Sequence, residues 1–137
     1  MKKWSIFSFL FLLAICFSSC DNESVEQNAT DEYYVKYEMN NSTSPYIGGT
    51  VNTTINAEDN KENIFVLNTS AAWETVIGPV KKGFNAQLKV NSSSNYYGYL
   101  KLNVKISVSK NGSPFALKKN DEKTGETSIQ INYTIDY

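Results

Sequence analysis

The segment "LKLNVKISVSK", residues 100–110, decides the fold class because apolar and polar side chains alternate along its whole length. The apolar side chains are Leu100, Leu102, Val104, Ile106 and Val108. Successive side chains of a β-strand point to opposite faces, so this pattern predicts a strand with one buried and one solvated face. Asn111-Gly112 follows directly and is typical of a two-residue hairpin turn, which needs positive φ at both positions.

The same alternation recurs elsewhere, and no apolar stripe of helical period competes with it. Strong alternation occupies residues 33–39, 84–91 and 128–137, and weaker strand patterns occupy residues 49–57, 63–68, 72–78 and 113–119. Solvated loops are expected at 58–63 ("EDNKEN") and 118–123 ("KKNDEK"). Residues 32–137 are therefore predicted to form an all-β domain, an antiparallel β-sandwich of immunoglobulin-like type with about 7–8 strands.

Residues 1–19 have the layout of a bacterial signal peptide. Lys2 and Lys3 precede an apolar stretch at 4–17, and the small pair Ser18-Ser19 ends it. The alternative, a transmembrane helix, needs roughly 20 apolar residues, and this run is shorter. We therefore expect residues 1–19 to be removed during export.

The two cysteines differ in the residue that precedes each of them. Cys20 follows the small Ser19, whereas Cys16 follows Ile15. The segment "FSSC" resembles the lipobox of bacterial lipoproteins, although Phe17 stands where that motif usually has an aliphatic residue. The resemblance implies that Cys20 becomes an acylated N-terminus, and two or three acyl chains such as palmitate hold a protein stably on a membrane. Cys16 would leave with the signal peptide, so the mature chain would have no thiol for a disulfide, a metal or a nucleophile.

Residues 20–31 comprise this cysteine and a polar, acidic stretch, "DNESVEQNATD", that we interpret as a flexible tether. Acidic residues directly after the cysteine also resemble the export signal of bacteroidete-type surface lipoproteins, which implies an outer-membrane lipoprotein exposed on the cell surface. The other interpretation is a solvated spacer. The composition leaves both open, and with them whether the anchor faces the periplasm or the outside.

Four segments together carry a further family resemblance. They are "YYVKYEM" (33–39), "GGTVNTTINA" (48–57), "AAWETVIGPVKKGFNAQLKV" (71–90) and "LKLNVKISVSKNG" (100–112). Their succession is similar to the periplasmic domain of the mycobacterial small membrane proteins and to related immunoglobulin-like lipoproteins. That family has a transmembrane helix where this chain has a lipobox. The resemblance implies a non-enzymatic accessory role beside an envelope transporter.

The composition removes several classes of chemistry. The chain has no histidine, so imidazole metal sites and Ser-His-Asp triads are excluded. All 13 basic residues are lysines, and loss of Lys2 and Lys3 leaves 11 of them against 14 acidic residues, a net charge of −3. Without arginine and with this charge, the chain is not expected to bind nucleic acid.

Carboxylates are the remaining candidates for catalysis or metal binding. Glu38, Glu74 and Asp136 lie in or near predicted strands, but the alternation places Glu38 and Asp136 on solvated faces. The acidic loop at 58–63 lacks the glycine and the oxygen spacing of a calcium loop. We therefore expect no enzymatic activity, no cofactor and no metal.

Aromatic residues provide the one candidate binding site. Tyr96, Tyr97 and Tyr99 crowd the serine-led loop before residue 100, and the strand alternation sends Tyr97 and Tyr99 outward. Outward aromatic rings are typical of recognition patches for glycans, peptides or proteins, and the alternative is packing under a loop. Trp73 is expected to fill the core rather than to stack on a sugar.

Two function hypotheses follow from these patterns. The first is a lipid-anchored cell-envelope module that docks to a partner protein or transporter. The second is a surface glycan-binding lipoprotein that uses Tyr96, Tyr97 and Tyr99, with Tyr46 as a further contact.

Overall fold

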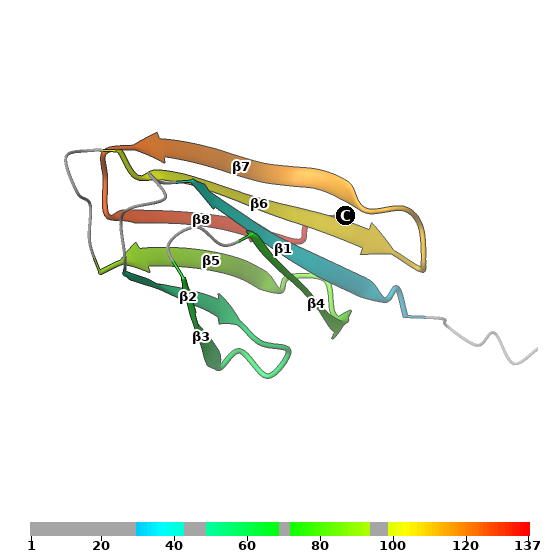
Figure 1. Ribbon diagram of the computed structural model, residues 1–137. Coiled ribbons are helices and arrows are strands. Elements are labelled where there is room, and N and C mark those ends of the chain that lie inside the picture. The colour runs from blue at the N-terminus through cyan, green and yellow to red at the C-terminus, as the bar shows by residue number, and fades with distance from the viewer. Residues whose placement is uncertain (1–29, 43–48, 69–71, 94–98) are drawn as a thin grey trace, which may run out of the picture.

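The computed structural model describes residues 30–42, 49–68, 72–93 and 99–137. These residues form eight β-strands and no helix (Figure 1). The strands are β1 (Tyr33–Ser42), β2 (Thr50–Asn56), β3 (Glu62–Asn68), β4 (Ala72–Val80), β5 (Asn85–Ser92), β6 (Lys101–Lys110), β7 (Ala116–Thr124) and β8 (Ser128–Thr134). No helix in the described part of the chain is long and apolar enough to cross a membrane.

The strands build two four-stranded antiparallel sheets that pack face to face. Their strand orders are β4-β1-β6-β7 and β3-β2-β5-β8. Only the β2–β3 and β6–β7 connections join neighbours in one sheet, so the other connections pass from sheet to sheet. The prediction of an all-β antiparallel sandwich is confirmed, and the architecture is consistent with an immunoglobulin-like type.

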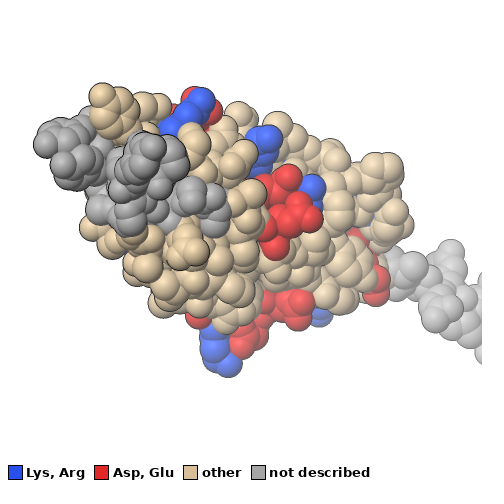
Figure 2. All heavy atoms as spheres, viewed as in Figure 1, with Lys and Arg blue, Asp and Glu red and all other residues tan. Residues whose placement is uncertain are grey.

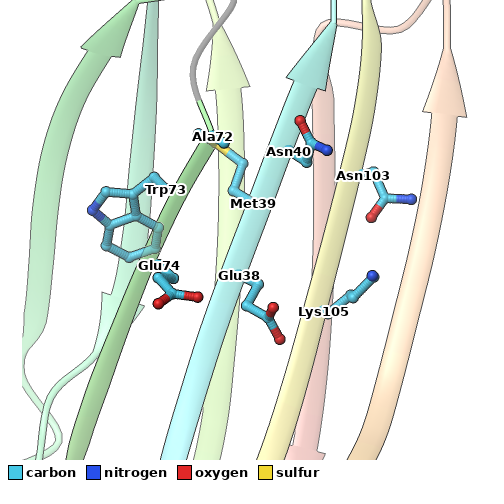
Figure 3. A pocket seen from close by; sticks show the side chains of 8 residues that line it. All are labelled: Glu38, Met39, Asn40, Ala72, Trp73, Glu74, Asn103 and Lys105. Atoms are coloured by element: carbon cyan, nitrogen blue, oxygen red, sulfur yellow. The ribbon is translucent and has the colours of Figure 1, made fainter.

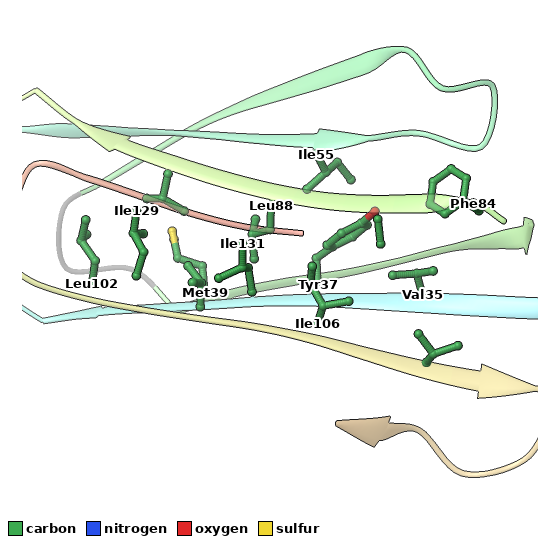
Figure 4. Packing of buried hydrophobic residues seen from close by; sticks show 14 of the residues in the cluster. Val35, Tyr37, Met39, Ile55, Phe84, Leu88, Leu102, Ile106, Ile129 and Ile131 are labelled. Atoms are coloured by element: carbon green, nitrogen blue, oxygen red, sulfur yellow. The ribbon is translucent and has the colours of Figure 1, made fainter. Parts of the chain in front are cut away.

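The core lies between the sheets and is built from the alternating apolar positions (Figure 4). Tyr37, Leu88 and Ile106 are fully buried, as the alternation predicted. The Tyr37 hydroxyl donates a hydrogen bond to the Asn56 carbonyl oxygen at 3.2 Å, and burial raises the pKa of this hydroxyl well above its ordinary value. The polar hydroxyl is thereby satisfied inside an apolar layer.

Two predicted hairpin tips are confirmed. Asn111 and Gly112 both have positive φ, at 51° and 75°, and the Ser113 N–H donates to the Lys110 carbonyl across the turn at 3.0 Å. At the β2–β3 tip the Ala57 N–H donates to the Lys61 carbonyl at 2.7 Å. The loop predicted at 58–63 is shorter than expected, because Glu62 and Asn63 already belong to β3.

The prediction of a loop at 118–123 is wrong, since this tract lies inside β7, which begins at Ala116 rather than at residue 113. Lys119, Asp121 and Lys123 stand opposite the buried Ile106, Val104 and Leu102 of β6, and therefore point toward the inner side of the sheet. Because β7 is an edge strand, charged groups on its inner side still reach water. The apolar alternation that marks other strands is therefore absent here.

The beginning and the end of the domain meet beside β1. Asp31 forms an ion pair with Lys110 at 2.7 Å, and Lys110 and Asn111 lower the pKa of this carboxyl group through hydrogen bonds. The Tyr33 hydroxyl donates to the Tyr137 carbonyl oxygen, and the two rings meet edge to face with centroids 5.8 Å apart. These contacts hold Asp31 and Tyr33 against Lys110 and Tyr137.

Candidate functional site: a polar groove on one sheet

The predicted site residues fall mostly outside the described part of the chain. Cys20, Tyr96 and Tyr97 lie there, as does Tyr46. Tyr99 is described, and 66% of it is exposed, whereas Leu100 beside it is buried. The outward orientation predicted for Tyr99 is confirmed.

The outer face of the β4-β1-β6-β7 sheet carries a shallow depression of about 290 Å³ (Figure 3). Its lining residues are Glu38, Met39, Asn40, Ala72, Trp73, Glu74, Asn103 and Lys105. Most of them are the polar residues that alternate with the buried apolar ones along β1 and β6, and they therefore lie on the solvated face of the sheet. The antiparallel register then aligns Glu74, Glu38 and Lys105 in one row across three strands.

A second depression of about 210 Å³ continues the first toward the beginning of β6. The two share Asn40, Asn103 and Lys105, so we treat them as one surface and call it the polar groove. At this end, Lys101 forms an ion pair with Glu122 at 2.9 Å, and the Asn103 amide donates to Glu122 at 3.0 Å. Both contacts lower the pKa of the Glu122 carboxyl group, the one with Lys101 more strongly.

The charges in the middle of the polar groove are only partly neutralised. Glu38 pairs with Lys36 at 3.3 Å. Glu74 lies opposite Glu38 on the neighbouring strand, and like charges in this position destabilise a sheet. Among the described residues, neither Glu74 nor Lys105 has an ion-pair partner within 4.0 Å. The groove therefore offers one carboxylate and one ammonium group that form no ion pair with another described residue.

The visible surface has the same mixed character. Figure 2 shows acidic and basic side chains next to one another among uncharged residues, and no broad area of a single sign. A mixed surface offers both donors and acceptors of hydrogen bonds to a polar partner.

Trp73 of β4 is one of the residues that line the polar groove. It is half-buried, packs against the core, and meets Phe65 with ring centroids 4.9 Å apart. Trp73 therefore packs against the core, as expected, although it is only partly buried. It also belongs to the lining of the groove.

The sequence patterns did not single out Asn40, Asn103 and Lys105. Each is an ordinary polar residue at an outward position of a strand. They become neighbours only because β1 pairs with β6 and not with β2, the next strand in sequence. Alternation predicts that each of them lies on a solvated face of its own strand, but it does not predict that these faces belong to the same sheet.

A scan against protein-family models finds no match for this chain, and no curated protein matches it. Within residues 30–42, 49–68, 72–93 and 99–137, no three His, Cys, Asp or Glu side chains are grouped as metal ligands would be. The polar groove and the sequence around Cys20 are therefore the features of this chain that point to a function.

Proposed function

We propose that the protein is a lipid-anchored binding module of the bacterial cell envelope that docks to a partner protein and performs no catalysis. The polar groove is its recognition surface. The observation that carries this proposal is the presence of Glu74 and Lys105 on the exposed face of one sheet, where neither forms an ion pair with another described residue. Proteins place rim charges in this way to select and orient a partner of complementary charge.

The anchor in this proposal is Cys20. Its place after Ser18-Ser19 supports acylation there, and residues 21–31 would hold the domain away from the membrane. Metabolic labelling with a fatty acid tests this step. Cys20→Ser should abolish incorporation of the label, and Cys16→Ser, the matched control, should retain it. Label in the Cys20→Ser chain would show that the lipobox assignment is wrong.

Charge reversal in the groove tests the recognition step. The full chain carrying Lys105→Glu or Glu74→Lys should lose the envelope protein that the unaltered chain retains during purification from membranes. Lys89→Glu is the matched control for Lys105→Glu, because Lys89 lies on β5 in the other sheet. The proposal fails if the unaltered chain retains no partner, or if all four chains retain the same one.

A second candidate function is glycan binding, and the exposure of Tyr99 favours it. Tyr99 stands two residues before Lys101, which lines the end of the polar groove, so the strand alternation puts its ring on the same side of the sheet as the Asn103 amide. Glycan-binding sites commonly combine stacking on an aromatic ring with hydrogen bonds from polar side chains. Binding to a glycan array that Asn103→Ala and Tyr99→Ala both abolish, with the fold intact, would support this function over protein docking.

A further inference from the structure

Strand β3 is an edge strand with two apolar side chains, Ile64 and Val66, in the middle of its outward face. It pairs with β2 on one side, and no described strand pairs with it on the other. Ile64 and Val66 point outward and are 64% and 67% exposed, while Phe65 between them packs against the core. An edge strand also presents half of its backbone N–H and C=O groups to any strand that approaches.

The other edge strands carry features that oppose pairing. On β7, Lys119, Asp121 and Lys123 point inward and the register with β6 shifts, both of which are known to block edge association. On β4, Pro79 removes a backbone donor. Strand β8 lies alongside β6 and β7 of the opposite sheet. Of the described edges, β3 and β8 have neither an inward charge, a proline nor a register shift within them, but β8 lies against the opposite sheet.

The order of residues in β3 is self-complementary. If two copies pair antiparallel about Phe65, Ile64 of each faces Val66 of the other, so four exposed apolar side chains form one continuous patch. In the same register, the one charged residue of the strand, Glu62, faces the uncharged Asn68. A parallel pairing would instead bring the two Glu62 carboxylates together. For two copies of β3, the apolar match of Ile64 with Val66 and the position of Glu62 therefore favour the antiparallel over the parallel arrangement.

We propose that β3 is a self-association edge, through which two copies of the chain join their β3-β2-β5-β8 sheets into one continuous sheet about a two-fold axis. The polar groove lies on the other sheet, and its Trp73 end contacts Phe65 of β3. The dimer would present two grooves, which raises the avidity for a partner that is itself repeated. The inference does not depend on what the groove binds.

Cysteine cross-linking tests both the pairing and its register. Two full-length chains with different tags, one carrying Ile64→Cys and the other Val66→Cys, are coexpressed and their membranes oxidised. Residues directly opposite in an antiparallel pair lie about 4.5–5.5 Å apart at Cα, within the range of a disulfide. We expect a cross-link between the two differently tagged chains, and much less between two Ile64→Cys chains, whose cysteines would be diagonal.

The unaltered chain measures the background from Cys16 and Cys20, and a pair of Val76→Cys chains tests chance contact from another exposed edge valine. Equal cross-linking at positions 64 and 76, or none above background at position 64, would overturn the proposal.

A matched pair of charge substitutions gives the second test. Val66→Glu places a carboxylate in the apolar patch and should convert the detergent-purified full chain to monomer in sedimentation analysis. Val76→Glu makes the same change on β4, where Lys36 lies opposite, and should leave the dimer in place. A chain that sediments as a monomer before any substitution, or a dimer that survives Val66→Glu, would refute the inference.

Discussion

Replacing Val104 with aspartate would place a carboxyl group at the centre of the β4-β1-β6-β7 sheet. Val104 is fully buried, and its neighbours in register are Met39 on β1 and Asp121 on β7. Met39 offers no hydrogen bond of useful strength to a carboxylate, and Asp121 would repel one. The substituted side chain would therefore stay protonated in the folded state, with a pKa raised by burial and by its acidic neighbour.

The magnitude follows from that pKa. A carboxyl group in water has a pKa of about 3.9, so keeping it neutral at pH 7 costs about 1.36 kcal/mol for each of roughly three pH units, or about 4 kcal/mol. Loss of the buried valine side chain adds about 1.5 kcal/mol. A loss of about 5–6 kcal/mol is comparable to the whole unfolding free energy of many domains, which lies at about 5–15 kcal/mol.

Denaturant unfolding of residues 30–137 at several pH values measures this loss. Because the carboxyl pKa is higher in the folded than in the unfolded chain, the charge-dependent part should vanish below about pH 4 and grow as the pH rises. Val104→Asn is a matched control that is nearly isosteric and does not ionise, so its loss should not follow this pH dependence. Val76→Asp, on the exposed edge and opposite Lys36, should change stability by less than about 0.5 kcal/mol. If Val104→Asp unfolds like Val76→Asp, the assignment of the inner face is wrong.

Two further substitutions test the exposed and the charged parts of the domain. Tyr99→Ala should change the unfolding free energy by less than about 0.5 kcal/mol, because Tyr99 is 66% exposed. Its comparison, Tyr37→Ala, should cost about 3–5 kcal/mol, because Tyr37 is fully buried. Similar losses of the two variants in thermal melts would contradict the outward orientation of Tyr99. Asp31→Asn should lower the unfolding free energy at neutral pH, because it removes the ion pair with Lys110. Since the folded-state pKa of Asp31 is lowered, the difference in unfolding free energy between the two domains should shrink as the pH falls below about 4 and further through the folded-state pKa. A difference that persists in strong acid would exclude the ion pair as its source.

Local patterns in the sequence determined the strands and their inner faces. Residues 100–109 alternate strictly, and every predicted inward side chain from Leu100 to Val108 is buried. The Asn111-Gly112 turn followed from the same local logic, because positive φ is a property of two adjacent residues. The two hairpins could be predicted in this way, since their partners are neighbours along the chain.

The one strand tract mistaken for a loop shows where local patterns fail. Residues 118–123 carry charges on both sides, and a charged tract is typical of a loop in any single sequence window. Only the position of β7 at the edge of its sheet lets Lys119 and Asp121 stand in inward positions and remain solvated.

Only the tertiary structure decided which solvated strand faces combine into the polar groove and which strand lies at an edge. Alternation assigns each residue to one side of its own strand and carries no information about which strands are neighbours. Asn40 and Asn103 are more than sixty residues apart, and they meet because β1 pairs with β6. The apolar outward face of β3 likewise gained its meaning from the place of that strand at an edge, since the same residues in a central strand would have had partners on both sides.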